Sequence, residues 1–164
     1  MERQGIIVIA YDGSSASEKA LGEAGRLLAG WPALVVVVWK AGLGFELIER
    51  PTSTVGLPPA PIDIRTAVEV DRELSEAAQR LAQKGARLAR DAGFEADGLA
   101  IADDPDTPVA ETIVRVVRER GARAVVVGAH GHGGVGSLLL GSTSRDVIRH
   151  APCPVVVTRE TNGR

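Results

Sequence analysis

The sequence predicts an α/β protein built on a doubly wound, five-stranded parallel sheet with helices on both faces. Short valine-rich apolar runs alternate strictly with segments whose apolar residues recur at helical spacing. The runs are continuously apolar, which is typical of parallel strands buried on both faces. Strict alternation of strand and helix favours a parallel sheet. We expect strands at 5–10, 34–39, 94–102, 123–128 and 154–158, and helices at 15–28, 67–92, 108–120 and 143–150.

The first strand is the apolar run over 5–10, and the small and polar residues after it predict a turn. Ser15 and Glu18 have the spacing of a capping box, in which a serine caps a helix and a glutamate returns to the serine backbone. The apolar residues that follow recur at helical spacing as far as Leu28. The second strand is apolar throughout.

The alternation stops after the second strand. Prolines bracket and punctuate the next segment, so we expect a long loop over 40–65, a kind of segment that is often functional or mobile. These prolines are Pro51, Pro58, Pro59 and Pro61, with Pro32 just before the second strand. A long helix over 67–92 follows, because apolar residues line one face of it, and Gly93 ends it.

The second half of the chain repeats the pattern more regularly. Thr107 and Pro108 fit the N-cap and the first residue of a helix, and Gly121 ends that helix. The fourth strand, 123–128, leads into a glycine-rich segment. A short helix and a last strand follow it, so the glycine-rich segment lies between a strand and a helix.

Composition limits the class of protein. The 164 residues fit one domain, which we expect to span 1–160, and 45% hydrophobic with 24% charged residues is typical of a globular chain. The net charge of −2, without a block of like charge, argues against a nucleic acid partner. Cys153 is the single cysteine, which excludes an intrachain disulfide. Neither a signal peptide nor a membrane-spanning run is evident, so we expect a cytoplasmic protein without a membrane partner.

The glycine-rich segment carries the chemistry. Gly128, Gly131 and Gly141 lie between a strand and a helix, and Ser142 and Thr143 begin that helix. Glycines let the main chain approach a phosphate, and a helix N-terminus offers free N–H groups and a positive dipole end. Several such donors at about 1.5–3 kcal/mol each would hold a phosphate. The segment therefore predicts a nucleotide phosphate site.

Two other phosphate motifs do not fit. Gly131, Gly133 and Gly136 match the dinucleotide-binding spacing, but no helix opens there and no acidic residue follows at the end of a second strand. The chain also contains no Gly-x4-Gly-Lys-(Ser/Thr). We therefore expect neither a dinucleotide-binding site nor a P-loop.

Other polar residues have two interpretations. Asp12 follows the first strand and is either a helix cap or a ligand contact; Ser14 and Ser15 can already cap, which favours the ligand. His130 and His132 lack neighbouring cysteines or carboxylates, so we predict no metal ligands among protein side chains and favour nucleotide contact for His130.

The chain resembles the universal stress protein family in its ATP-binding form. The family signature Gly-x2-Gly-x9-Gly-(Ser/Thr) is complete at Gly128, Gly131, Gly141 and Ser142. Further landmarks match over 10–14 after the first strand, over 110–113 in the third helix, and over 150–155 before the last strand. The resemblance covers nearly the whole chain except 40–65.

This resemblance implies an adenine nucleotide alpha hydrolase-like fold with strand order 3-2-1-4-5, and ATP with Mg²⁺ or Mn²⁺ as the ligand. Asp12 is expected near the ribose or adenine, Val38 against the adenine, and the glycine segment along the ribose and phosphates. The last strand is expected to pair across a two-fold axis in a homodimer. The full set of expected contacts is Ala10, Asp12, Val38, Val127, Gly128, His130, Gly131, Gly141, Ser142 and Thr143.

The favoured function is thus an ATP-binding stress-response or signalling module. An enzyme is the alternative, with slow ATP hydrolysis or autophosphorylation at Ser142 or Thr143. Hydrolysis needs a positioned base or water and neutralised charge, and the glycine segment offers no lysine, with Arg145 the nearest cation. We therefore predict no catalytic residue. A cyclic-nucleotide binder and a nucleotide-independent dimerisation scaffold are the remaining alternatives.

Overall fold

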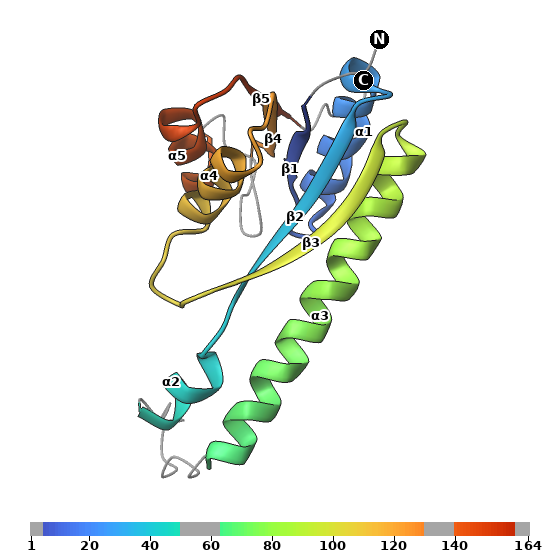
Figure 1. Cartoon of the computed structure of the whole chain (residues 1–164). Helices are drawn as coiled ribbons and strands as arrows, with labels where there is room; N and C mark the ends of the chain where they lie inside the picture. Colours follow the sequence, from blue (N-terminus) through green and yellow to red (C-terminus); the bar gives the residue numbers. More distant parts are fainter. Residues whose placement is uncertain (1–4, 50–62, 130–139, 160–164) are drawn as a thin grey trace.

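The computed structural model describes residues 5–49, 63–129 and 140–159. In these ranges the chain forms, in order, β1 (Ile7–Ala10), α1 (Ser15–Leu28), β2 (Pro32–Lys40), α2 (Leu43–Glu49), α3 (Ile64–Asp91), β3 (Glu95–Asp103), α4 (Val109–Glu119), β4 (Ala124–Gly128), α5 (Ser142–His150) and β5 (Val155–Thr158). Figure 1 shows α1 and α3 on one face of the sheet and α4 and α5 on the other.

All five strands belong to one parallel sheet in the order β3-β2-β1-β4-β5. This confirms the predicted doubly wound sheet and the strand order that the resemblance implied. β1 is central, and its Ile9 lies beside Val35 of β2 on one side and Val126 of β4 on the other. The order reverses between β1 and β4, because the chain builds the sheet outward from β1 in both directions.

Two apolar layers hold the helices to the sheet, because successive side chains of a strand point to opposite faces. Ile9 and Val126 are fully buried in the layer under α1 and α3. Their neighbours Val8 and Val125 are fully buried in the layer under α4 and α5. Burial of each such side chain contributes about 1.5–3 kcal/mol, so the continuous valine runs stabilise both layers at once.

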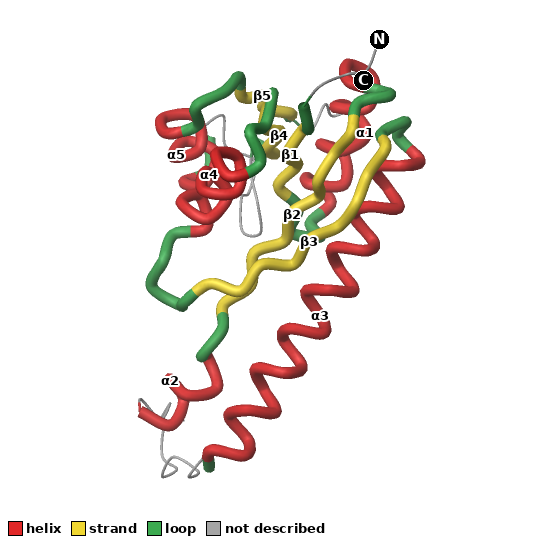
Figure 2. The backbone as a smooth tube through the Cα atoms, in the orientation of Figure 1, coloured by secondary structure: helices red, strands yellow, loops and turns green. Residues whose placement is uncertain are grey.

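β2 and β3 continue past the other strands. β1 follows β2 only as far as Val36, whereas β2 stays paired with β3 up to Lys40 and Asp103. Figure 2 shows this two-stranded extension alongside the first half of α3, with α2 packed at its far end. The Gly42 N–H donates to the Asp71 carboxylate at 2.5 Å, and the Lys40 ammonium donates to the carbonyl of Asp104 at 3.1 Å.

The prediction of a loop over 40–65 is wrong for its first part, because Leu43–Glu49 forms α2. The prolines on which the loop prediction rested begin only at Pro51, so no proline prevents a helix over 43–49. Gly42, at a φ of +85°, turns the chain out of the extension and into α2. α3 begins at Ile64, with the Asp63 carboxylate accepting from the Thr66 N–H at 2.8 Å. Residues 50–62 lie outside the described ranges.

Two predicted helix caps are also wrong. Ser14, not Ser15, is the N-cap of α1, and its hydroxyl accepts from the Ser17 N–H at 3.1 Å. Thr107 does not cap α4; its hydroxyl donates to the Asp104 carboxylate at 3.0 Å, and α4 begins at Val109. At Thr107 the neighbouring Asp104 carboxylate is a stronger partner for the hydroxyl than the helix N-terminus.

The packing of α3 on the sheet predicts opposite effects for two helical glycines. An added Cβ at Gly85 would lie 2.7 Å from atoms of both Tyr11 and Val35, whereas one at Gly22 in α1 would meet nothing within 4 Å. We expect Gly85→Ala to lower the free energy of unfolding by about 1–3 kcal/mol through overpacking. Gly22→Ala should raise it by up to about 1 kcal/mol through helix propensity. Urea denaturation measures both, and equal effects would contradict this packing.

Candidate functional site

The carboxyl ends of β1 and β4 form the edge where we place the site. These strands are neighbours in the sheet, and the strand order reverses between them. The chain leaves β1 toward α1 on one face and leaves β4 toward α5 on the other. Ligands of open parallel sheets bind at such a switch point, outside the carboxyl ends of the strands. The segments after β1 and β4 are therefore the candidates for a ligand site.

The turn after β1 is organised around Asp12. Its Oδ1 accepts hydrogen bonds from the Ser14 N–H at 3.0 Å and from the Ser14 hydroxyl at 2.6 Å. Ser14 in turn caps α1, so the helix cap is the serine, and Asp12 supports it from two residues before the cap. Gly13 between them has a φ of +79°, which the tight turn requires. The aspartate is half-buried at this edge, between the end of β1 and the start of α1.

The segment after β4 is closed at its base. The Gly141 N–H donates to the Ala129 carbonyl at 2.8 Å, and the Ser144 hydroxyl donates to the Gly128 carbonyl at 2.6 Å. The Ala129 N–H donates to the Thr158 carbonyl at 2.8 Å, which ties the same point to β5. The chain thus departs from β4 and returns to α5 at one place. His130 and Gly131 lie outside the described ranges.

The N-terminus of α5 lies at this closure. Gly141 is its N-cap and provides no side-chain hydrogen bond to the first turn, and the first helical bond runs from the Arg145 N–H to the Gly141 carbonyl. Ser142 is exposed and Thr143 is half-buried. Early N–H groups of a helix need partners from outside it, and they carry the positive end of the dipole. The position suits an anion at the carboxyl edge of β4.

An apolar surface lies beside these polar groups. Ala10 pairs with Val36 in β1 and β2, and Val38 lies two residues further along β2, so both side chains point to the same face. Val127 at the end of β4 belongs to that face as well, where it is buried under α4 and α5. The structure therefore brings Ala10, Val38 and Val127 to one side of the sheet, with Ala10 and Val38 only partly buried.

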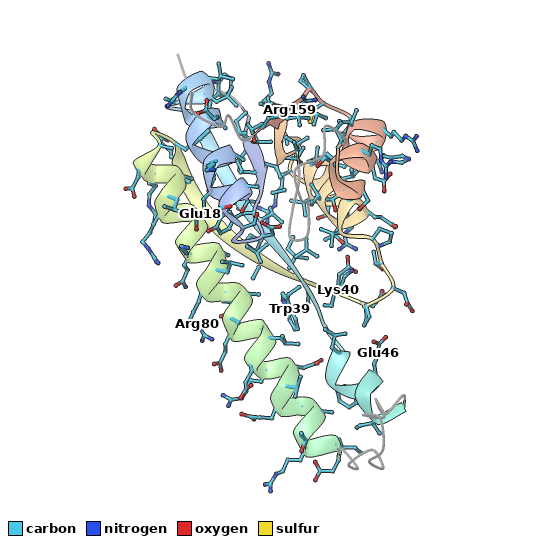
Figure 3. All side chains as sticks on the ribbon, turned by 180° about the vertical axis from the view of Figure 1, so that it is seen from behind. Glu18, Trp39, Lys40, Glu46, Arg80 and Arg159 are labelled. Atoms are coloured by element: carbon cyan, nitrogen blue, oxygen red, sulfur yellow. The ribbon has the colours of Figure 1, made fainter. Side chains whose placement is uncertain are left out.

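A buried serine and an ionic cluster escaped the sequence analysis. Ser144 is 4% exposed and holds the end of β4 to α5. Its signal was the run of hydroxyl residues at the start of that helix, of which only the first two were assigned. Glu18, expected to complete a capping box, instead accepts from the Tyr11 hydroxyl at 3.2 Å and from the Lys84 ammonium at 2.6 Å. Figure 3 shows Glu18 where α1 meets α3.

The remaining reactive side chains do not gather at this edge. His150 is exposed at the end of α5, with its Nδ1 2.8 Å from the Asp146 carbonyl oxygen. Burial raises the pKa of the Cys153 thiol, which disfavours the reactive thiolate. Among the described residues, no three histidine, cysteine or acidic side chains gather as a metal site would require. None of the helices described there is long and apolar enough to cross a bilayer.

Comparison with known proteins identifies relatives by sequence. The model of the Universal stress protein family matches residues 105–159. Universal stress protein YxiE of Bacillus subtilis is 27% identical over 156 residues, which cover 93% of this chain and 97% of the Bacillus protein. The similarity thus extends along both proteins nearly from end to end, well beyond the glycine-rich segment.

Solved structures share the fold. Protein MJ0577 of Methanocaldococcus jannaschii superposes with a TM-score of 0.70 at 21% identity, covering 97% of this chain and 98% of its own. A universal stress protein in complex with cAMP gives 0.62 at 18% identity, covering 94% and 96%. The Archaeoglobus fulgidus universal stress protein in complex with dAMP gives 0.55 at 22% identity, covering 93% and 96%. At these identities the structures establish the shared architecture.

The closure between β4 and α5 predicts unequal roles for two serines of one helix turn. Ser144→Ala removes the donor from a buried serine to the part-buried Gly128 carbonyl, so we expect the free energy of unfolding to fall by about 1–3 kcal/mol. Ser142→Ala removes an exposed hydroxyl and should change it by less than about 0.5 kcal/mol. Chemical denaturation of the ligand-free protein measures both. A Ser144→Ala protein as stable as Ser142→Ala would mean that the hydroxyl does not hold the closure.

Proposed function

The chain belongs to the universal stress protein family, and we propose that it is a stress-response module of the cytoplasm that binds an adenine nucleotide, with ATP the preferred ligand. The observation that carries this proposal is the closure of Ala129 on Gly141, which presents the α5 N-terminus at the switch point of the sheet. Relatives with cAMP and dAMP bound support the nucleotide class.

Different groups of the described residues suit the base, the ribose and the phosphates. The partly buried Ala10 and Val38, with Val127 beneath, offer an apolar surface for the base. Asp12, two residues after Ala10, offers an acceptor to ribose or adenine donors, and its Oδ1 already accepts from Ser14. Gly128 and the first turn of α5 at Gly141, Ser142 and Thr143 offer main-chain and hydroxyl donors to phosphates. We assign His130 and Gly131 to the phosphate path from the motif alone.

A divalent cation, Mg²⁺ or Mn²⁺, would accompany the triphosphate. It would neutralise phosphate charge, for which the glycine segment offers no lysine and Arg145 is the nearest cation in the sequence. Ser142 and Thr143 would offer their hydroxyls to the phosphates rather than to the ion. The proposal contains no hydrolytic step.

Calorimetric titration with Mg-ATP tests the site. We expect the nucleotide-free wild type to bind, and Gly131→Val and Gly141→Val to lose binding, because a branched side chain would occupy the space of the phosphate. Gly22→Val, at an exposed helix position with open space around it, is the matched control and should bind like the wild type. A folded wild type that ignores adenine nucleotides overturns the proposal in favour of a scaffold. Displacement of ATP by stoichiometric cAMP would make a cyclic nucleotide the ligand.

We also propose that the module is a homodimer joined through β5. This strand is an edge of the sheet, and its valines are half-exposed. The carbonyls of Pro154 and Thr158 accept from β4, so the backbone of Val157 points away from β4 toward a possible partner strand. An edge strand can pair with a strand of another chain.

Proline at Val157 should separate the dimer. Val157→Pro removes an outward N–H without removing a hydrogen bond to β4, and proline is tolerated at such edge positions. We expect the wild type to sediment as a dimer, the variant as a monomer, and the control Val157→Ala, which keeps its N–H, as a dimer. A dimeric proline variant would place the interface elsewhere.

A further inference from the structure

Three contacts seat the β1–α1 turn on the middle of α3. Leu81 packs against Gly13, where an added Cβ would lie 2.8 Å from its Cδ1. Gly85 allows the Tyr11 ring to pack directly on the helix. Lys84, between them, reaches the Glu18 carboxylate. One face of α3 thus contacts the residue before Asp12, the residue after it, and the first turn of α1.

The polar part of this contact converges on a single atom. Glu18 Oε1 accepts from the Lys84 ammonium at 2.6 Å and from the Tyr11 hydroxyl at 3.2 Å. Tyr11 is 3% exposed, in the core between the sheet and α3. Its backbone N–H donates to the Val36 carbonyl at 2.9 Å. The phenol therefore leaves the apolar core only at its hydroxyl, and that hydroxyl ends on Glu18.

We propose that Lys84 and Glu18 are positioning residues for the ligand at Asp12, holding the β1–α1 turn through the hydroxyl of Tyr11. Glu18 contacts Tyr11 and Lys84 contacts Glu18, so each acts on Asp12 through the turn. The inference rests on the proposed function, because Asp12 must contact the nucleotide for its position to matter.

The connection follows from the chain geometry. Tyr11 and Asp12 are consecutive, so fixing the phenol at both its ring and its hydroxyl limits the rotation of the peptide that carries Asp12. On the other side, Asp12 is bonded to Ser14, which caps the same helix turn that carries Glu18. The turn is therefore held on α3 by Tyr11, Glu18 and Lys84, and within itself by the bonds between Asp12 and Ser14. Removing Lys84 leaves Glu18 with the phenol alone.

Nucleotide affinity of matched α3 variants tests the role. We expect Lys84→Met to weaken Mg-ATP binding by about threefold to tenfold, within the range of coupling through a packed network. Lys84→Arg, which keeps a donor to Glu18, should recover most of the loss. Arg80→Met is the control one turn earlier, where the side chain is 69% exposed and paired with Glu76 at 3.7 Å, and it should bind like the wild type. Figure 3 shows Arg80 pointing away from the core.

The single tyrosine of the chain provides a readout that loss of stability would not imitate. Burial, and next the Glu18 carboxylate, raise the pKa of the Tyr11 phenol, the Lys84 charge lowers it, and Asp12 adds to the rise. Lys84→Met should therefore move the ultraviolet titration of the phenol to higher pH, and Glu18→Gln should move it to lower pH. General loosening of the core would instead lower the pKa in both variants.

Amide exchange in the ligand-free protein separates this inference from the proposed function. The N–H groups of Ser17 and Glu18, both bonded to Ser14, should exchange faster in Lys84→Met than in Arg80→Met. Equal exchange, or equal ATP affinity of these two variants, overturns the positioning role. A wild type that binds no nucleotide overturns the proposed function and the ligand part of the inference. Faster exchange in Lys84→Met would then still support the role of Lys84 and Glu18 in holding the β1–α1 turn.

Discussion

The parallel pairing of β1 with β4 is the constraint on which the rest of this structure depends. Because both strands run the same way, the chain leaves them at one edge, and the reversal of strand order sends it to opposite faces. The Asp12 turn and the closure of Ala129 on Gly141 therefore become neighbours although more than half of the chain separates them. Two fully buried valine and isoleucine layers make this pairing stable enough to support polar turns at its end.

The hydrogen bonds at that edge join residues within the Asp12 turn and residues within the closure between β4 and α5. Ser14 orients Asp12, Ser144 joins the end of β4 to α5, and Gly141 closes on Ala129. These bonds pre-organise the backbone before any ligand arrives, which lowers the entropy cost of binding. The apolar face of Ala10 and Val38 lies on one side of the sheet at the same edge.

α3 links this edge to a part of the molecule that the core does not require. Its middle carries the contacts to Tyr11, Gly13 and Glu18, and its first half runs along the extension of β2 and β3 to α2. Phe45 on α2 and Ile64 and Val68 on α3 expose apolar side chains at that far end. One rigid helix thus spans from the exposed end to the support of the Asp12 turn.

The glycine spacing predicts a phosphate segment. The sequence also predicts all five strands, four of the five helices in the described residues and the parallel sheet, because hydrophobic periodicity is a local property. It did not determine which partner each polar side chain would choose. Glu18 left its expected capping role for Tyr11 and Lys84, Thr107 turned to Asp104, and Ser144 took a buried carbonyl. The helix over 43–49 was also missed, because nearby prolines dominated a segment that itself contains none. Only the tertiary structure decided these matters, since a hydrogen-bond partner distant in the chain exists only after the sheet has brought it near.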